Sequence, residues 1–310
     1  MKSCSCEGLA SARFLPTRVD AVLRLTITQG PAGVYKRIMR PAYEKTSVRA
    51  AAVAGLFYPD DPGELRDSVL QLLTTAATHR TEVAPKALIV PHAGYIYSGF
   101  VAARAYALVA NLAQIKRVVL IGPSHRVYLS GMAVPTAHAF RTPLGDIPID
   151  RAACQLLRDS GEVIAADAPH AQEHSLEVQL PFLQVLFGEF ELIPIVAGTA
   201  SPAQVGAVLQ RVWGNGETLV LISSDLSHYH PYEVARRIDS ETSELILRRS
   251  PTLVGEQACG AVCINGLLHL AREQDYPITQ IERLNSGDTA GDRDRVVGYG
   301  AFGIGTRASS

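Results

Sequence analysis

Three histidines in this sequence directly follow apolar segments, at positions where imidazoles could bind a metal. KALIV leads into PHAGYIYSG with His92, RVVLI into GPSHR with His125, and LVLIS into SDLSHYH with His228. Each apolar segment has the length and β-branched content of a buried strand. In open α/β sheets the ligand crevice lies outside the carboxyl ends of the strands. We therefore expect these histidines and Asp225 to border one cleft.

Cys259 can complete a ligand set. It precedes the predicted helix AVCINGLLHLARE, and the positive end of a helix lowers a thiol pKa and favours the metal-binding thiolate. Two imidazoles and a thiolate suit iron, zinc or copper, and three protein ligands leave a position open for water or substrate. Ordinary alternatives exist, because Asp225 could cap the helix that follows it and Cys259 could be a plain buried thiol.

Other polar and aromatic residues lie close to these segments. Glu173 and Glu177 are four residues apart in EHSLEVQLPFLQVLFG, which we expect to be helical, so they would share a face that lines a pocket or meets solvent. The aromatic residues of HAGYIYSG suggest a tight turn that carries aromatic lining. The candidate pocket residues are Tyr95, Tyr97, Ser124, His174 (as a partner of the ligands) and Ser224.

The elements that position these residues alternate between strands and amphipathic helices from Val48 onward, which predicts one α/β domain over residues 48–310. Asp61 and Pro62 are typical of a helix start. Expected strands are 86–90, 116–122, 190–196, 218–223, 278–286 and 295–304. Expected helices are 61–73, 98–112, 151–161, 173–188, 201–213, 232–249 and 261–273.

Composition restricts the class of protein. The chain of 310 residues is 47% hydrophobic with a formal net charge of -1, so no global field would recruit nucleic acid. No apolar run approaches the roughly 20 residues that span a bilayer. Five irregularly spaced cysteines indicate a reducing compartment, and we expect a cytoplasmic protein with no membrane association. Residues 1–47 are basic and lack a clear period, so we predict a poorly ordered extension, with a targeting arm as the alternative.

The sequence resembles the Memo family, also called AmmeMemoRadiSam system protein B. The matching segments occur in family order from residue 48 to about 304: AGLFYPDDP, PHAGYIYSG, GPSH, TPLGDIPID, EHSLEVQLPFL, SSDLSHY, ACG and GYGAFGI. The resemblance implies a fold similar to class III extradiol dioxygenases, a three-layer α/β/α sandwich with a mixed, largely parallel central sheet. It also implies a metal on His92, His125 and Cys259, with Asp225 and His228 beside it.

The resemblance leaves the reaction open. Ring-cleaving dioxygenases hold Fe(II) with two histidines and a carboxylate, whereas this sequence offers Cys259, so dioxygenase activity does not follow from the fold. Our first hypothesis is a mononuclear Fe(II) redox enzyme that acts on a small organic substrate, with His228 as general acid/base and Asp225 orienting a histidine or serving as an additional ligand. The alternatives are a non-enzymatic protein that binds a peptide or partner in the same cleft, and a zinc-dependent hydrolase. Family resemblance further implies functional association with AMMECR-type and radical-SAM proteins.

Overall fold

The computed structural model describes residues 29–30, 33–34, 47–76, 85–112 and 114–305. The chain divides into two units, Met1–Lys45 and Thr46–Ser310. In the first unit, β1 (Gln29–Gly30) pairs with β2 (Gly33–Val34) in antiparallel orientation. The rest of residues 1–46 lies outside the described residues, so the poor order that we expected there stays a prediction.

A mixed sheet forms the centre of the second unit. Within the described residues it has nine strands. Eight follow the order β12-β14-β4-β11-β5-β10-β6-β9, and the ninth, β13, pairs with β14 on the edge opposite β4. The central strands β4, β11, β5 and β10 are parallel, whereas β14 runs antiparallel to β4 and β6 runs antiparallel to β10. The bounds are β4 Ala87–Val90, β5 Arg117–Pro123, β6 Met132–Val134, β9 Val163–Ala165, β10 Glu191–Ala197, β11 Thr218–Ser223, β12 His228–His230, β13 Ile278–Asn285 and β14 Val296–Ile304.

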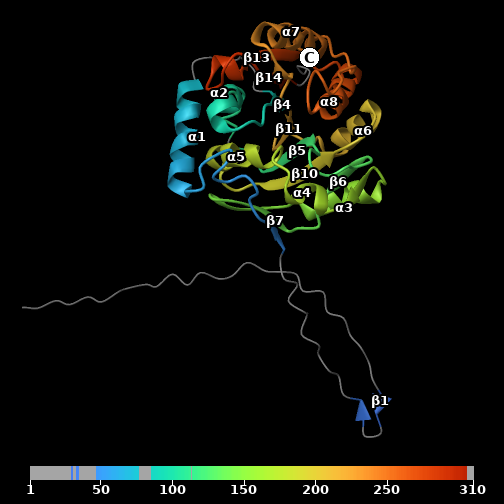
Figure 1. The fold of residues 1–310 in the computed structure, drawn as a ribbon. Coiled ribbons are helices and arrows are strands. Elements are labelled where there is room, and N and C mark those ends of the chain that lie inside the picture. Colours follow the sequence, from blue (N-terminus) through green and yellow to red (C-terminus); the bar gives the residue numbers. More distant parts are fainter. Residues whose placement is uncertain (1–28, 31–32, 35–46, 77–84, 113, 306–310) are drawn as a thin grey trace, which may run out of the picture. The chain divides into compact units, whose positions relative to one another are not determined.

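Helices cover both faces of this sheet. Figure 1 shows α1, α2 and α5 on one side of the central strands and α3, α6 and α8 on the other. This arrangement confirms the predicted α/β class with a mixed sheet between helical layers. The helices are α1 Pro62–Ala76, α2 Tyr95–Tyr106, α3 Arg151–Asp159, α4 Ala168–Ala171, α5 Leu180–Phe187, α6 Pro202–Val212, α7 Tyr232–Leu247 and α8 Ala261–Glu273, with short 3-10 turns η1 Glu177–Gln179 and η2 Ser286–Asp288.

The core explains why the central strands read as unbroken apolar runs. Every residue of β4 and β11 is buried, as is every residue of β5 after Arg117. Strands covered by helices on both faces need no alternation between apolar and polar side chains. A smaller sheet consists of β3 (Val48–Arg49), β7 (Ala139–Thr142) and β8 (Gly145–Pro148), and an isolated bridge from Ile149 to Leu192 joins it to β10. The central strands β4, β5 and β11 end where their apolar runs end, and polar residues follow them.

Two local predictions were wrong. HAGYIYSG is not a turn with aromatic lining, because α2 begins at Tyr95 and both tyrosines belong to its first turn. Residues 173–176 are not helical; they precede η1, so Glu173 and Glu177 do not share a helix face. The predicted cap of α1 is confirmed, since the backbone N–H of Glu64 donates to Asp61 Oδ1 at 2.9 Å.

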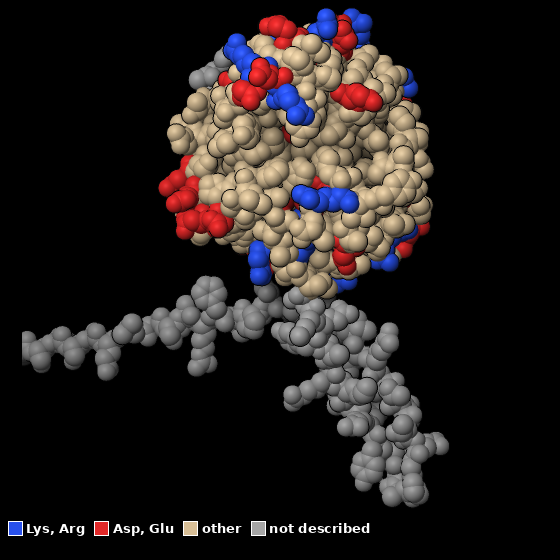
Figure 2. All heavy atoms as spheres, in the orientation of Figure 1, with Lys and Arg blue, Asp and Glu red and all other residues tan. Residues whose placement is uncertain are grey.

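The length and polarity of the helices determine whether they could cross a membrane, and the surface shows how charge is distributed. Among the described residues, every helix is too short or too polar to cross a bilayer. Figure 2 shows acidic and basic side chains interspersed around the edge of one face, with a largely uncharged and hollowed middle.

Candidate metal centre

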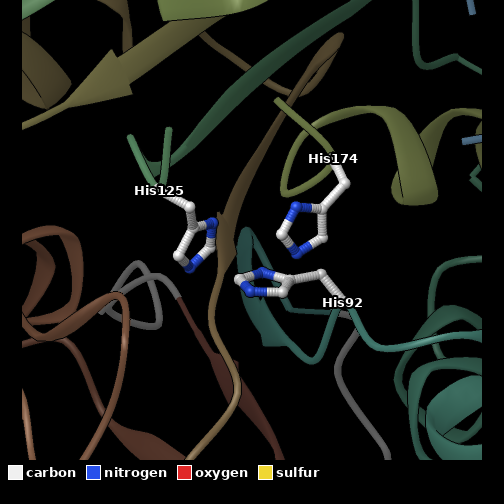
Figure 3. Close-up of side chains that lie close together, drawn as sticks. All are labelled: His92, His125 and His174. Carbon is white, nitrogen blue, oxygen red and sulfur yellow. The ribbon is translucent and has the colours of Figure 1, made fainter. Parts of the chain in front are cut away.

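Three imidazoles converge beyond the carboxyl ends of the central strands. His92 follows β4, His125 follows β5, and His174 comes from the non-helical segment before η1 (Figure 3). One ring nitrogen of each lies within 4.8 Å of the others. The His125 and His174 rings stack at 4.7 Å, and His92 meets both edge-on. The parallel strands thus bring two of these histidines together, and a connecting segment adds the third.

Hydrogen bonds fix the orientation and tautomer of His92. Its Nδ1 lies 2.9 Å from Ser223 Oγ, and that hydroxyl donates its only proton to Ser175 O at 2.6 Å. His92 Nδ1–H must therefore be the donor to Ser223, which leaves Nε2 unprotonated and able to accept. Burial lowers the pKa of His92 well below its ordinary value, and the neighbouring His125 and His174 lower it further. His92 is a neutral imidazole, the form that binds a metal.

A buried carboxylate holds His125 in the same way. Glu173 accepts the backbone N–H of His125 at 2.6 Å and lies 2.9 Å from His125 Nδ1. Because an ionised carboxylate only accepts, His125 Nδ1–H donates, and Nε2 is the ring nitrogen at which a metal would bind. Burial opposes ionisation of Glu173, but the hydrogen bonds from His125 and from the backbone of Ser175 outweigh it and hold its pKa at about 2. A histidine that donates one ring N–H to a carboxylate and uses its other ring nitrogen for the metal is a common arrangement in metal sites.

His174 lacks such a hydrogen bond. Its buried Nδ1 has no hydrogen-bond partner among the described residues, although Glu173 Oε1 lies 3.3 Å away. Phe57 packs on the ring with the centroids 4.9 Å apart. Burial lowers the pKa of His174 to about 4. A neutral imidazole whose buried Nδ1 has no hydrogen bond within the described residues is a reason to expect a ligand at this position.

Cys259 lies beside His92. Its Sγ is 3.3 Å from His92 Nε2 and accepts the backbone N–H of Asp225 at 3.3 Å. The thiol precedes α8, which begins at Ala261. Burial and the nearby Asp225 raise the pKa of Cys259 to about 12. The lowering that we expected from the helix terminus is therefore outweighed by desolvation, and a cation would be required to stabilise the thiolate.

Asp225 and His228 both lie near this cluster. The Asp225 carboxylate accepts the backbone N–H of His92 at 2.7 Å, and burial raises its pKa to about 7. It does not cap the following helix, because α7 begins after Pro231. His228 Nδ1 donates to the Leu226 carbonyl at 2.8 Å, which leaves Nε2 free, and burial lowers the pKa of His228. His228 is the first residue of β12, and Asp225 lies in the connection between β11 and β12.

Comparison with known proteins identifies the family. The model of the Memo-like protein family matches residues 49–303. A MEMO1 family protein of Ignicoccus hospitalis is 37% identical over 283 residues, which cover 82% of this chain and 97% of that protein. The chain belongs to the Memo family. A MEMO1 family protein of Thermotoga petrophila is 33% identical over 273 residues and covers 81% of this chain and 97% of its own. An uncharacterized protein of Escherichia coli K12 aligns in structure with a TM-score of 0.44 and 13% identity, over 69% of this chain and 98% of its own.

The remaining predicted pocket residues of this Memo-family chain have mostly structural contacts. Tyr95 is buried and its hydroxyl donates to Val178 O at 2.9 Å, so it belongs to the core rather than to the cleft. Tyr97 is 36% exposed. Ser124 Oγ donates to Val127 O at 2.6 Å within its own loop. Ser224 Oγ accepts the Gly260 N–H at 2.9 Å and so ties the loop after β11 to the residue next to the candidate thiol.

Sequence reasoning missed the residues that hold the ligands in place. Glu177 is fully buried; it pairs with Arg49 and accepts the backbone N–H groups of residues 52–53 at 2.7 and 3.0 Å and the Tyr58 hydroxyl at 2.5 Å. This carboxylate anchors the segment that carries Phe57 against the histidines. Only the acidic residues on either side of HSL in EHSLE hinted at such a role.

The donor set fits a metal. His92 presents an unprotonated Nε2, His125 is held by Glu173 through Nδ1, and His174 offers a buried nitrogen without a hydrogen bond. Typical metal–nitrogen and metal–sulfur bonds of about 2.0–2.1 and 2.3 Å place two adjacent ligand atoms roughly 3.1–3.6 Å apart. The 3.3 Å between Cys259 Sγ and His92 Nε2 lies within this interval. Imidazole and thiolate together suit iron, zinc or copper rather than magnesium or calcium.

Proposed function

We propose that this Memo-family protein holds one divalent metal, Fe(II) by preference, on His92, His125 and Cys259, and uses it in redox chemistry on a small organic substrate. The observation that carries the proposal is the convergence of three imidazoles, two of which (His92 and His174) have lowered pKa values, with a thiol 3.3 Å from one of them. His174 would be a fourth ligand or would face the substrate. The bound metal would supply Lewis-acid and one-electron redox chemistry.

The protein's own groups provide positioning and proton transfer. Glu173 orients His125, and Ser223 orients His92, so neither ring can turn without breaking a buried hydrogen bond. His228 keeps a free Nε2 and a lowered pKa, which is the form of a general base near neutral pH. Asp225 holds the backbone of His92 and lies against Cys259, so it positions both ligands.

Metal content of the full chain, purified without oxygen, tests the ligand set. We expect about one iron per chain after Fe(II) titration, and at least tenfold weaker binding in His125→Ala and Cys259→Ser, since each removes one ligand. His269→Gln is the matched control, because its imidazole pairs with Glu273 on α8, outside the cluster. Equal iron binding by His125→Ala and the wild-type chain would refute the proposed centre.

Cobalt substitution tests the thiolate directly. A thiolate bound to Co(II) produces an intense near-ultraviolet charge-transfer band, which we expect in the wild-type chain and in His174→Gln but not in Cys259→Ser. A band absent from the wild-type protein, with cobalt bound, would instead assign the third ligand to His174.

Oxygen uptake with a panel of small phenols and catechols tests the reaction. We expect His228→Gln to keep its iron and lose turnover, because only the base is removed. Iron binding without uptake, together with peptide binding that depends on the cleft, would favour the non-enzymatic alternative. Zinc binding in preference to iron would favour hydrolysis.

A further inference from the structure

A second polar cavity lies between α7 and β13, away from the candidate metal centre. Its volume is about 310 Å³, which is within the range of small-ligand sites. Tyr232, Arg236 and Asp239 line it from one face of α7, Arg283 lines it from β13, and Asp288 from η2. None of these residues contributes to the histidine cluster. The cavity therefore presents two guanidinium groups and two carboxylates to whatever enters it.

The two carboxylates already have protein partners. Asp288 accepts the Tyr232 hydroxyl and the backbone N–H of Asn285, the latter at 3.0 Å. Asp239 is 2% exposed and accepts the backbone N–H of Ser227 at 3.0 Å. Because these hydrogen bonds hold both carboxylates in place, the acids are parts of the cavity wall.

The two guanidinium groups are far less engaged. In the described part of the chain, the Arg283 guanidinium makes no hydrogen bond or ion pair, although it is half-buried. Within the same described residues, Arg236 makes a single ion pair, at 3.6 Å with Glu233, in which both side chains are largely exposed, and it lies over the Tyr232 ring at 5.7 Å. Exposed pairs of this kind hold a side chain weakly. The unused hydrogen-bonding capacity of the cavity thus belongs to the cations, each with five N–H donors.

We propose that this cavity binds a small organic anion, a carboxylate or a phosphate ester, through Arg283 and Arg236. Guanidinium groups bind both kinds of oxyanion in bidentate fashion, which gives direction as well as charge. The Arg293 guanidinium also lies over the Tyr232 ring, 4.4 Å from its centroid, and adds positive charge close to the cavity.

Binding here would reach the metal cleft through Asp239. This carboxylate holds the Ser227 N–H, directly before His228, and packs so tightly on β14 that a Cβ on Gly298 would lie 2.1 Å from its oxygen. Burial raises the pKa of Asp239, and the nearby charge of Arg283 opposes that rise. An anion that engages Arg283 therefore acts on the residue that fixes the His228 segment. The cavity is placed to regulate the centre, and its occupancy does not depend on which metal or reaction that centre supports.

Calorimetric titration of the full chain tests the proposal. The probes are citrate, glycerol 3-phosphate and inorganic phosphate, each compared with sodium chloride at equal ionic strength. We expect saturable binding of at least one organic probe, weakened about tenfold or more in Arg283→Gln, since a hydrogen bond to a charged group is lost. Arg237→Gln is the matched control, because it also removes one positive charge. Arg237 follows Arg236 on α7, but it is exposed and does not line the cavity.

Location is tested by hydrogen exchange with the bound probe. We expect slower exchange in peptides that cover residues 225–239 and 278–288. Three results would overturn the proposal: no saturable binding of any probe, equal weakening by Arg237→Gln and Arg283→Gln, or binding that is lost in His125→Ala and retained in Arg283→Gln. The last would place the anion at the histidine cluster instead.

Discussion

Glu173→Gln perturbs the support of His125 without changing the size of the side chain. One carboxylate oxygen accepts the His125 backbone N–H, and the other accepts His125 Nδ1–H and the Ser175 N–H at 2.9 Å. A carboxamide has one oxygen, so its NH2 group must face at least one of these donors. The variant loses a buried, charge-assisted acceptor in either orientation.

The pKa of Glu173 provides the size of the effect. Its pKa is held at about 2 in the folded chain, against an ordinary value of 4.5. At 1.36 kcal/mol per pKa unit, ionised Glu173 contributes about 3 kcal/mol to folding at pH 7. Because the folded pKa is depressed, this contribution is complete above the unfolded pKa and is lost as pH falls through the folded pKa. About half of it remains at pH 3.

Urea unfolding followed by circular dichroism measures this contribution. We expect Glu173→Gln to be about 3 kcal/mol less stable than wild type at pH 7 and about half as much at pH 3. Fe(II) affinity should fall about 10–100-fold, as for the loss of other groups that orient metal ligands. Glu189→Gln is the control, because Glu189 is exposed. Equal stability and equal iron affinity at pH 7 would refute the role assigned to Glu173.

Two further substitutions test how the cleft is held. Glu177→Gln leaves the buried guanidinium of Arg49 without its charge partner, so we expect the free energy of unfolding in urea to fall by about 3–5 kcal/mol. Changing the pH between 6 and 8 should not restore wild-type stability. Gly260→Ala would place a Cβ 2.6 Å from the Ser224 Cβ and displace the neighbouring thiol; iron affinity should fall at least tenfold, whereas Gly255→Ala, with no atom within 4 Å of its Cβ, should bind iron normally.

Much of this architecture could be predicted from local sequence. The apolar runs that become β4, β5 and β11 have no polar alternation, so they had to be covered on both faces, and the chain direction set which ends carry His92 and His125. Strand polarity then places those ends at one edge of a parallel sheet. Family resemblance pointed to the same histidines. Caps such as Asp61 are equally local and were predicted for the same reason.

Other features arise only when distant segments pack. Nothing local in EHSLE shows that Glu173 turns to His125 while Glu177 turns to Arg49, because both partners come from other parts of the chain. The same holds for Tyr95, which reads as cleft lining but points into the core towards Val178. Periodicity reports which residues are buried along one element; it contains no information on which neighbour each face meets. The tertiary structure alone decided that His174 joins the cluster, and that desolvation rather than the α8 dipole governs the Cys259 pKa.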